Sequence, residues 1–164
     1  MADEQLIQLL RQLVAIPSVN PALADDPAIG SEAPLAQFLA DHLAEKGFSI
    51  ERHEIVPGRP NVVARRGPLR RSAPFSSRHL DTQGIHGMTV PPFSGELRDG
   101  RIYGRGACDM KGPMAAALHA LTPEVLDALA AAGVQLIFVG AVGEEKGNVG
   151  ARQLVEWGSG RTRR

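Results

Sequence analysis

Residues Val134–Val139 read VQLIFV, a short and almost entirely apolar run. A strand that is covered on both faces of a sheet shows this pattern, whereas a strand with one solvent-exposed face alternates apolar and polar residues. The run therefore predicts a buried strand in the middle of a sheet.

Helical patterns occur on both sides of this run along the chain. Apolar side chains recur at helical spacing in several segments, and proline or glycine residues end these patterns. The predicted helices extend from about residue 6 to Ala15, from Ser31 as the N-cap to Gly47, from Met114 to Leu129 with a break at Thr122-Pro123, and from Val149 to Trp157.

Shorter β signals lie between the helices. Phe48–Val56 alternates imperfectly, and Asn61–Ala64 is rich in valine, so we expect two adjacent strands. Asp99-Gly100 stands between two short alternating runs, which is a strong local signal for a hairpin. Because helices alternate with strands, the fold class is α/β, with a sheet flanked by helices.

Composition excludes several classes of protein. The chain has 164 residues, enough for one domain with a real core, and its 18 basic and 18 acidic residues cancel. We therefore expect neither nucleic acid nor a membrane surface as a partner. Cys108 is the only cysteine, so no intramolecular disulfide can form, and a cytoplasmic location fits best. No signal peptide and no run of about 18 apolar residues is visible.

Two arginine-rich stretches fit this picture poorly. Arg65–Arg78 holds five arginines where an apolar strand should lead into the next motif, and the last six residues, SGRTRR, hold three more. We interpret both as products of an altered reading frame. Sequencing the source DNA would contradict this hypothesis if both stretches proved to be encoded in the same reading frame as the rest of the chain.

Side chains that can bind metal gather in three segments, each after a predicted strand or hairpin. Residues at i and i+2 of a strand face the same side, so Asp81 can reach the imidazole of His79 and fix its tautomer. The alternative interpretation of this pair is a surface loop. Groups at strand ends of an open α/β sheet converge on one edge, which is where ligand sites form.

The other two segments also permit two interpretations. Asp109 lies among glycines in GRGACDMKG, where its two oxygens could touch two cations or simply cap a helix. Lys111 and Cys108 in the same segment are more simply a solvated charge and a small apolar filler. Glu144 and Glu145 could divide metal binding and proton transfer, or be solvated acids ahead of a helix.

Together these segments resemble the cocatalytic zinc metallopeptidase family that contains acetylornithine deacetylase, succinyl-diaminopimelate desuccinylase, aminoacylase and glutamate carboxypeptidase. SSRHLDTQG, PPFSGELRDGRIYGRGACDMKGPMAAAL and GEEKGNVGAR are similar to its signatures. The resemblance covers about residues 5 to 157. It implies a zinc-exopeptidase-like mixed sheet flanked by helices, and hydrolysis of the amide bond of N-acyl amino acids or small peptides.

The resemblance also implies roles for single residues. His79 would bind one zinc, Asp109 would bridge two zinc ions, and Glu145 would bind the second. Asp81 would orient His79, and Glu144 would be the general base. Cobalt or manganese could replace zinc at such a carboxylate-rich site.

The chain departs from the family pattern in what it lacks. We expect residues 1–157 to be the N-terminal part of a catalytic domain and residues 158–164 to be an aberrant basic tail. The later metal ligands and the lid and dimerisation domain, through which the family is often homodimeric, are missing. Each zinc would keep two protein ligands, so we expect weak metal binding and impaired activity. The alternative function is an inactive remnant or a metal-binding fragment.

Overall fold

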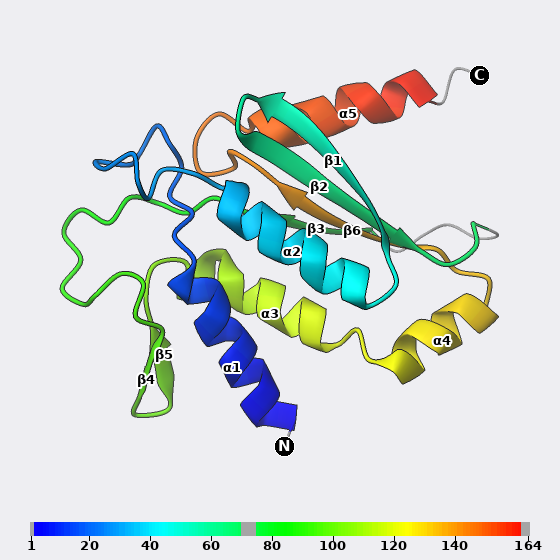
Figure 1. The fold of residues 1–164 in the computed structure, drawn as a ribbon, viewed down its shortest axis with the longest axis horizontal. Helices are drawn as coiled ribbons and strands as arrows, with labels where there is room; N and C mark the ends of the chain where they lie inside the picture. The colour runs from blue at the N-terminus through cyan, green and yellow to red at the C-terminus, as the bar shows by residue number, and fades with distance from the viewer. Residues whose placement is uncertain (1, 70–74, 162–164) are drawn as a thin grey trace.

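The computed structural model describes residues 2–69 and 75–161. Four strands form one sheet, in the spatial order β1 (Ser49–Val56), β2 (Arg59–Arg66), β6 (Leu136–Ala141) and β3 (Phe75–His79) (Figure 1). β1, β2 and β6 pair antiparallel in turn, whereas β3 runs parallel to β6. The prediction of a mixed α/β sheet with an apolar central strand is confirmed.

Helices cover both faces of this sheet. α1 (Ala2–Ala15), α2 (Ala33–Glu45), α3 (Gly112–His119) and α4 (Pro123–Ala131) contribute to the core on one face, and α5 (Val149–Arg161) lies on the other (Figure 1). Phe138 of β6 belongs to the larger core, while the neighbouring Val139 packs in a smaller core beside Leu154 of α5. Burial on both faces explains why β6 shows no alternation of apolar and polar residues.

The predicted hairpin forms a separate two-stranded sheet. β4 (Glu96–Arg98) and β5 (Arg101–Tyr103) pair antiparallel, and the hairpin projects from the body of the molecule (Figure 1). Asp99 and Gly100 have φ of 51° and 73°, the left-handed conformation that both central residues of a two-residue turn adopt.

Several element boundaries differ from those predicted, among them those of β6, α2 and α5. β6 begins at Leu136 rather than Val134, because Leu136 pairs with Arg66, the last residue of β2. α2 begins at Ala33 with Glu32 in the N-cap position, and Ser31 accepts the N–H of Ala33 just ahead of the helix. α5 continues past Trp157 to Arg161, into the segment that was expected to be a separate tail.

The arginine-rich stretch Arg65–Arg78 begins within β2, with two partnered side chains. Arg65 bonds the carboxylate of Glu51 at 2.6 Å and stacks over Trp157, and Arg66 donates to the carbonyl of Lys46. The side chains of Arg65 and Arg66 therefore make contacts within the fold. Residues 70–74 and 162–164, which carry part of both stretches, lie outside the described residues.

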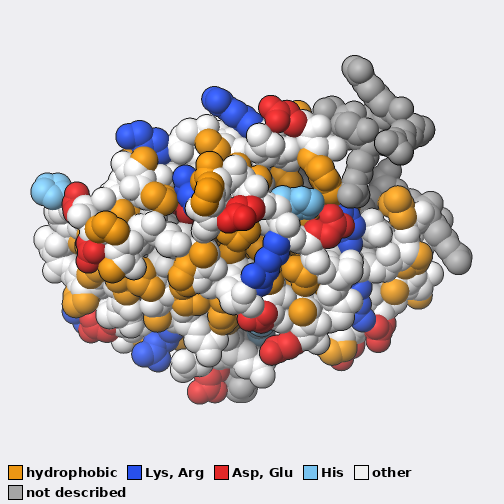
Figure 2. Space-filling model, turned by 45° about the horizontal axis from the view of Figure 1, so that its top comes forward, with side chains coloured by type: hydrophobic (Ala, Val, Ile, Leu, Met, Phe, Trp, Pro, Cys, Tyr) orange, Lys and Arg blue, Asp and Glu red, His pale blue; other side chains and the backbone are white. Residues whose placement is uncertain are grey.

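The surface carries charges of both signs. On the face shown in Figure 2, acidic and basic side chains are interspersed, and hydrophobic side chains lie between them in small groups. None of the helices within residues 2–69 and 75–161 is long and apolar enough to cross a membrane.

Candidate metal centre

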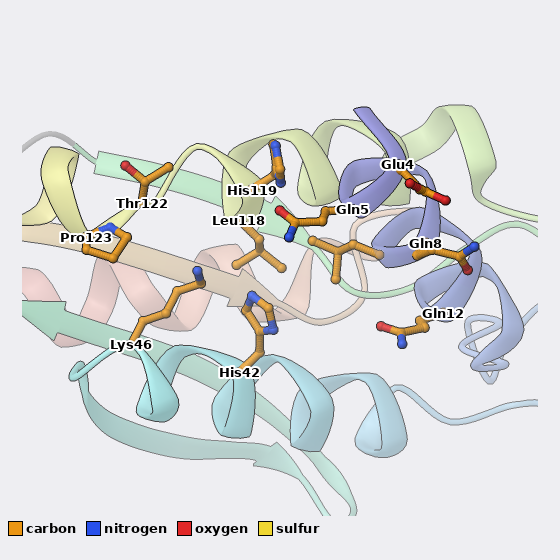
Figure 3. Close-up of a pocket in the computed structure, with 11 residues that line it drawn as sticks. Glu4, Gln5, Gln8, Gln12, His42, Lys46, Leu118, His119, Thr122 and Pro123 are labelled. Atoms are coloured by element: carbon orange, nitrogen blue, oxygen red, sulfur yellow. The ribbon is translucent and has the colours of Figure 1, made fainter. Parts of the chain in front are cut away.

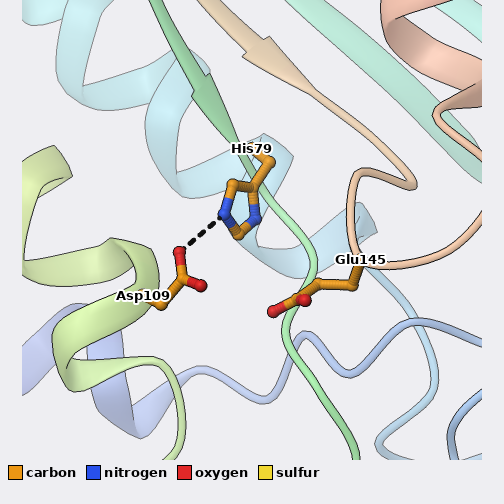
Figure 4. A group of neighbouring side chains, drawn as sticks. All are labelled: His79, Asp109 and Glu145. Atoms are coloured by element: carbon orange, nitrogen blue, oxygen red, sulfur yellow. Dashed lines mark hydrogen bonds and ion pairs between the residues drawn. The ribbon is translucent and has the colours of Figure 1, made fainter.

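Three potential ligands meet at one edge of the sheet. His79 ends β3, and the loop after β6 carries Glu144 and Glu145; since the two strands are parallel, both chain segments leave the sheet at the same edge. Asp109 comes from η1 (Ala107–Lys111), a turn with a π-helical hydrogen-bond pattern. One ligand atom each from His79, Asp109 and Glu145 lie within 4.8 Å of one another (Figure 4).

The ring of His79 is fixed by contacts at both nitrogens. Its Nδ1 lies 2.9 Å from the carbonyl oxygen of Asp81, and its Nε2 lies 3.0 Å from Oδ1 of Asp109. A carbonyl oxygen can only accept, so Nδ1 carries the hydrogen and donates. Nε2, which faces Oδ1 of Asp109, is therefore the ring nitrogen that could bind a cation.

The surroundings of His79 favour a positive charge. Burial disfavours the protonated ring, but the hydrogen bonds to Asp109 and to the carbonyl of Asp81, with the charges of Asp81 and Glu144, outweigh it and raise the pKa of His79 above its usual value. In the cation-free chain this ring holds a proton more tightly than an exposed histidine does. The same carboxylates would stabilise a metal ion in place of that proton.

Asp81 is buried and holds the loop that carries the paired glutamates. Its carboxylate accepts hydrogen bonds from Nδ2 of Asn20 at 2.7 Å and from the backbone N–H groups of Glu144 and Glu145, both at 2.9 Å. That carboxylate is 3.7 Å from Nδ1 of His79, so the carbonyl of Asp81, rather than its side chain as expected, contacts the ring. Asp81 thus links β3, the loop and the segment around Asn20.

The side chain of Glu145 is held by hydrogen bonds, whereas that of Glu144 is largely exposed. The carboxylate of Glu145 accepts from the backbone N–H of Gln83 at 3.1 Å and from its side-chain amide at 2.8 Å. The side chain of Glu144 is 52% exposed, with an oxygen 3.8 Å from Nε2 of His79. The sequence analysis did not identify Gln83, although it lies only two residues after Asp81 in the same segment.

Lys111 is not the solvated charge that the sequence suggested. It is 1% exposed, and its Nζ donates to the carbonyl of Ile16, just past the end of α1, at 2.6 Å. Burial lowers the pKa of Lys111 to about 7. The side chain thereby ties the turn of Asp109 to α1, whereas Cys108 in the same turn is exposed.

A larger cavity in the described part of the chain lies away from this cluster. It measures about 700 Å³, lies between α1, α2 and the α3–α4 connection, and is lined mainly by polar side chains that include His42, Lys46 and His119 (Figure 3). None of the three potential ligands lines it. A smaller cavity of about 180 Å³ adjoins the ligand cluster and is lined by His79, Glu144 and both polar and apolar neighbours, among them Ser77, Asn148 and Met110.

His42 should make the stability of the protein sensitive to acid. Burial, with a contribution from Lys46 that outweighs Glu45, lowers the pKa of His42 below its usual value of 6.5. The folded state then binds the proton less tightly, so this contribution to stability is lost as pH falls below about 6.5. Urea unfolding of the wild type and His42→Gln between pH 5 and 8 should show the wild type losing more stability on acidification. A constant difference between the two proteins would contradict the assignment.

Comparison with known protein families gives one match that includes all three ligands. The model of the peptidase family M20/M25/M40 matches residues 76–164. A succinyl-diaminopimelate desuccinylase of Methylorubrum extorquens is 34% identical over the whole chain, and an N-formyl-4-amino-5-aminomethyl-2-methylpyrimidine deformylase of Halalkalibacterium halodurans is 32% identical over 94% of it. The chain spans 42% and 36% of the length of these two curated relatives.

Solved structures show a similar arrangement of elements. Human carnosine dipeptidase 1 superposes with a TM-score of 0.74 at 27% identity, covering 94% of this chain and 35% of that protein. The dipeptidase Dug1p from Saccharomyces cerevisiae has a TM-score of 0.72 at 22% identity over 93% of this chain and 35% of its own, a likeness of fold.

Proposed function

This chain belongs to the peptidase family M20/M25/M40, and we propose that it carries part of the active site of a metal-dependent hydrolase that cleaves the amide bond of N-acyl amino acids or small peptides. The observation that carries the proposal is the convergence of His79, Asp109 and Glu145 beside the partly exposed Glu144. The relatives are named for succinyl and formyl groups and for dipeptides, so a small acyl group on an amine is the substrate class we propose.

The donor set fits zinc. One imidazole nitrogen and two carboxylates are common zinc ligands, and the carbonyl that receives the Nδ1–H of His79 orients the ring as outer partners of ligand histidines do. One oxygen of Asp109 faces His79 and the other lies on the side of Glu145 (Figure 4), which supports Asp109 as a bridge between two ions. Zinc bound there would polarise the substrate carbonyl and make water more acidic.

Glu144 is positioned to move the proton. Its backbone is fixed by Asp81, while its half-exposed side chain can rotate between the entering water and the leaving group. We propose that its carboxylate takes the proton from the attacking water and delivers it to the leaving amine nitrogen. Asp81 would keep His79 and this loop in register.

The proposal is tested by metal titration combined with hydrolysis assays. The metal-free chain should bind zinc and cobalt by calorimetry, and Asp109→Asn should weaken this binding about tenfold or more because it removes a charged ligand. Asp99→Asn is the matched control, since Asp99 is an exposed carboxylate in the hairpin turn.

The hydrolysis assay offers the zinc-loaded chain N-succinyl, N-formyl and N-acetyl amino acids and dipeptides. We expect turnover that a chelator abolishes. Turnover that persists in Asp109→Asn after chelation would contradict the proposal. Tight binding of zinc without turnover of any of these substrates would instead favour the second candidate, a metal-binding polypeptide that does not catalyse by itself.

A further inference from the structure

The loop that carries Glu144 and Glu145 has its two ends side by side. The N–H of Gly150, in the first turn of α5, donates to the carbonyl of Val142 at 3.0 Å, and Asn148 donates to the carbonyl of Gly143 at 2.6 Å. The segment between them is therefore a closed loop, and whatever fixes its base also fixes the direction in which the two glutamates leave the sheet.

A side chain from another strand lies at that base. Asn61 of β2 points to the same face of the sheet as Val63, which packs beneath α5, and it is 0% exposed. Its Oδ1 accepts the N–H of Val142 at 2.9 Å, and its Nδ2 donates to the carbonyl of Gly150 at 3.0 Å. One amide group thus satisfies a backbone group on each side of the loop.

The fit around this amide is close. A Cβ atom on Gly150 would lie 2.5 Å from Oδ1 of Asn61 and 2.5 Å from the carbonyl oxygen of Val142. Any larger residue at 150 would force the helix start away from the strand. The close approach of the start of α5 to Asn61 therefore depends on Gly150 as well as on Asn61.

We infer that Asn61 is a positioning residue for the metal centre, which sets the places of Glu144 and Glu145 by clasping the base of their loop. This inference rests on the cation site proposed above. Asp81 holds the middle of the loop through its backbone N–H groups, and Asn61 holds its ends. Asn61 touches none of the three potential ligands in the described contacts, so it acts on them only through the backbone.

The first test measures hydrogen exchange of the backbone amides in this loop, in the absence of any cation. In Asn61→Leu, a change of similar size that removes both hydrogen bonds, amide hydrogen exchange at Glu144 and Glu145 should rise about tenfold or more relative to the amides that join β1 and β2. The matched control is Val63→Ala, which alters an equally buried side chain on the same strand and face but not the loop. Exchange rates at the two glutamates that stay at the wild-type value in a folded Asn61→Leu would overturn the inference.

The second test measures cation affinity by cobalt absorption. Asn61→Leu should weaken it by about 10- to 100-fold, while Val63→Ala should leave it within about twofold. Gly150→Ala breaks the same clasp from the other side and should give the same pattern if Asn61→Leu does not fold. Equal losses in Val63→Ala and Asn61→Leu would reduce Asn61 to a general packing role. A wild-type chain that binds no cobalt would refute the proposed function, and the exchange measurement would still decide the role of Asn61.

Discussion

Replacing Glu144 with glutamine is expected to lower kcat for amide hydrolysis by about 10²- to 10⁴-fold while leaving zinc affinity nearly unchanged. Glutamine keeps the size and the backbone contacts to Asp81, but it cannot accept the proton of water. The measurement compares steady-state kinetics of the zinc-loaded wild type and Glu144→Gln with calorimetric zinc titrations of both.

The neighbouring glutamate provides the matched control. Glu145→Gln makes the same chemical change one residue later, where the carboxylate is a proposed ligand held by Gln83. It should weaken zinc binding, and added zinc should recover part of its activity. If Glu144→Gln lost zinc affinity while Glu145→Gln lost only kcat, Glu144 would be the ligand and Glu145 the general base.

Removal of the buried acid Glu32 is expected to lower the free energy of unfolding by about 3–5 kcal/mol. The carboxylate of Glu32 is fully buried and accepts two hydrogen bonds from the guanidinium of Arg59, at 2.5 and 2.8 Å. This pair joins the start of α2 to the start of β2. In Glu32→Leu the largely buried guanidinium would lose its counter-charge, which costs more than the pair itself contributes.

A double variant separates these two effects. Glu32→Leu/Arg59→Met removes both charges and should recover most of the lost stability, because no unpaired charge is left inside. Urea unfolding of the four proteins in the cycle gives the coupling energy. Additive losses in the two single variants would show that the pair is not coupled, contrary to the geometry.

Much of the fold could be predicted from local signals. The apolar run before Ala141 marked the central strand, and Asp99-Gly100 marked the hairpin, because both patterns act within a few residues. The boundaries were less certain since partners set them: β6 starts where β2 ends, and Glu32 takes the N-cap position of α2 while its side chain pairs with Arg59 instead of capping.

The potential ligands of the candidate site could be predicted from the sequence, but the side chains that hold their segments in place could not. His79, Asp109 and Glu145 stood out by residue type and order, and they lie together. Asn61 and Lys111 did not stand out, because an asparagine in a strand and a lysine after a turn are usually exposed. Their burial arises from segments 81 and 95 residues away along the chain, which no local pattern shows.

The parallel pairing of β3 with β6 has a consequence for how such a chain can diversify. His79 and the loop of Glu145 leave adjacent strands at one edge, so hydrogen bonds of the backbone, and not the surface loops, determine how far apart they start. Selection can therefore reshape the surroundings of the ligand cluster in many ways while the pairing of β3 with β6 still sets where the segments of His79 and Glu145 begin.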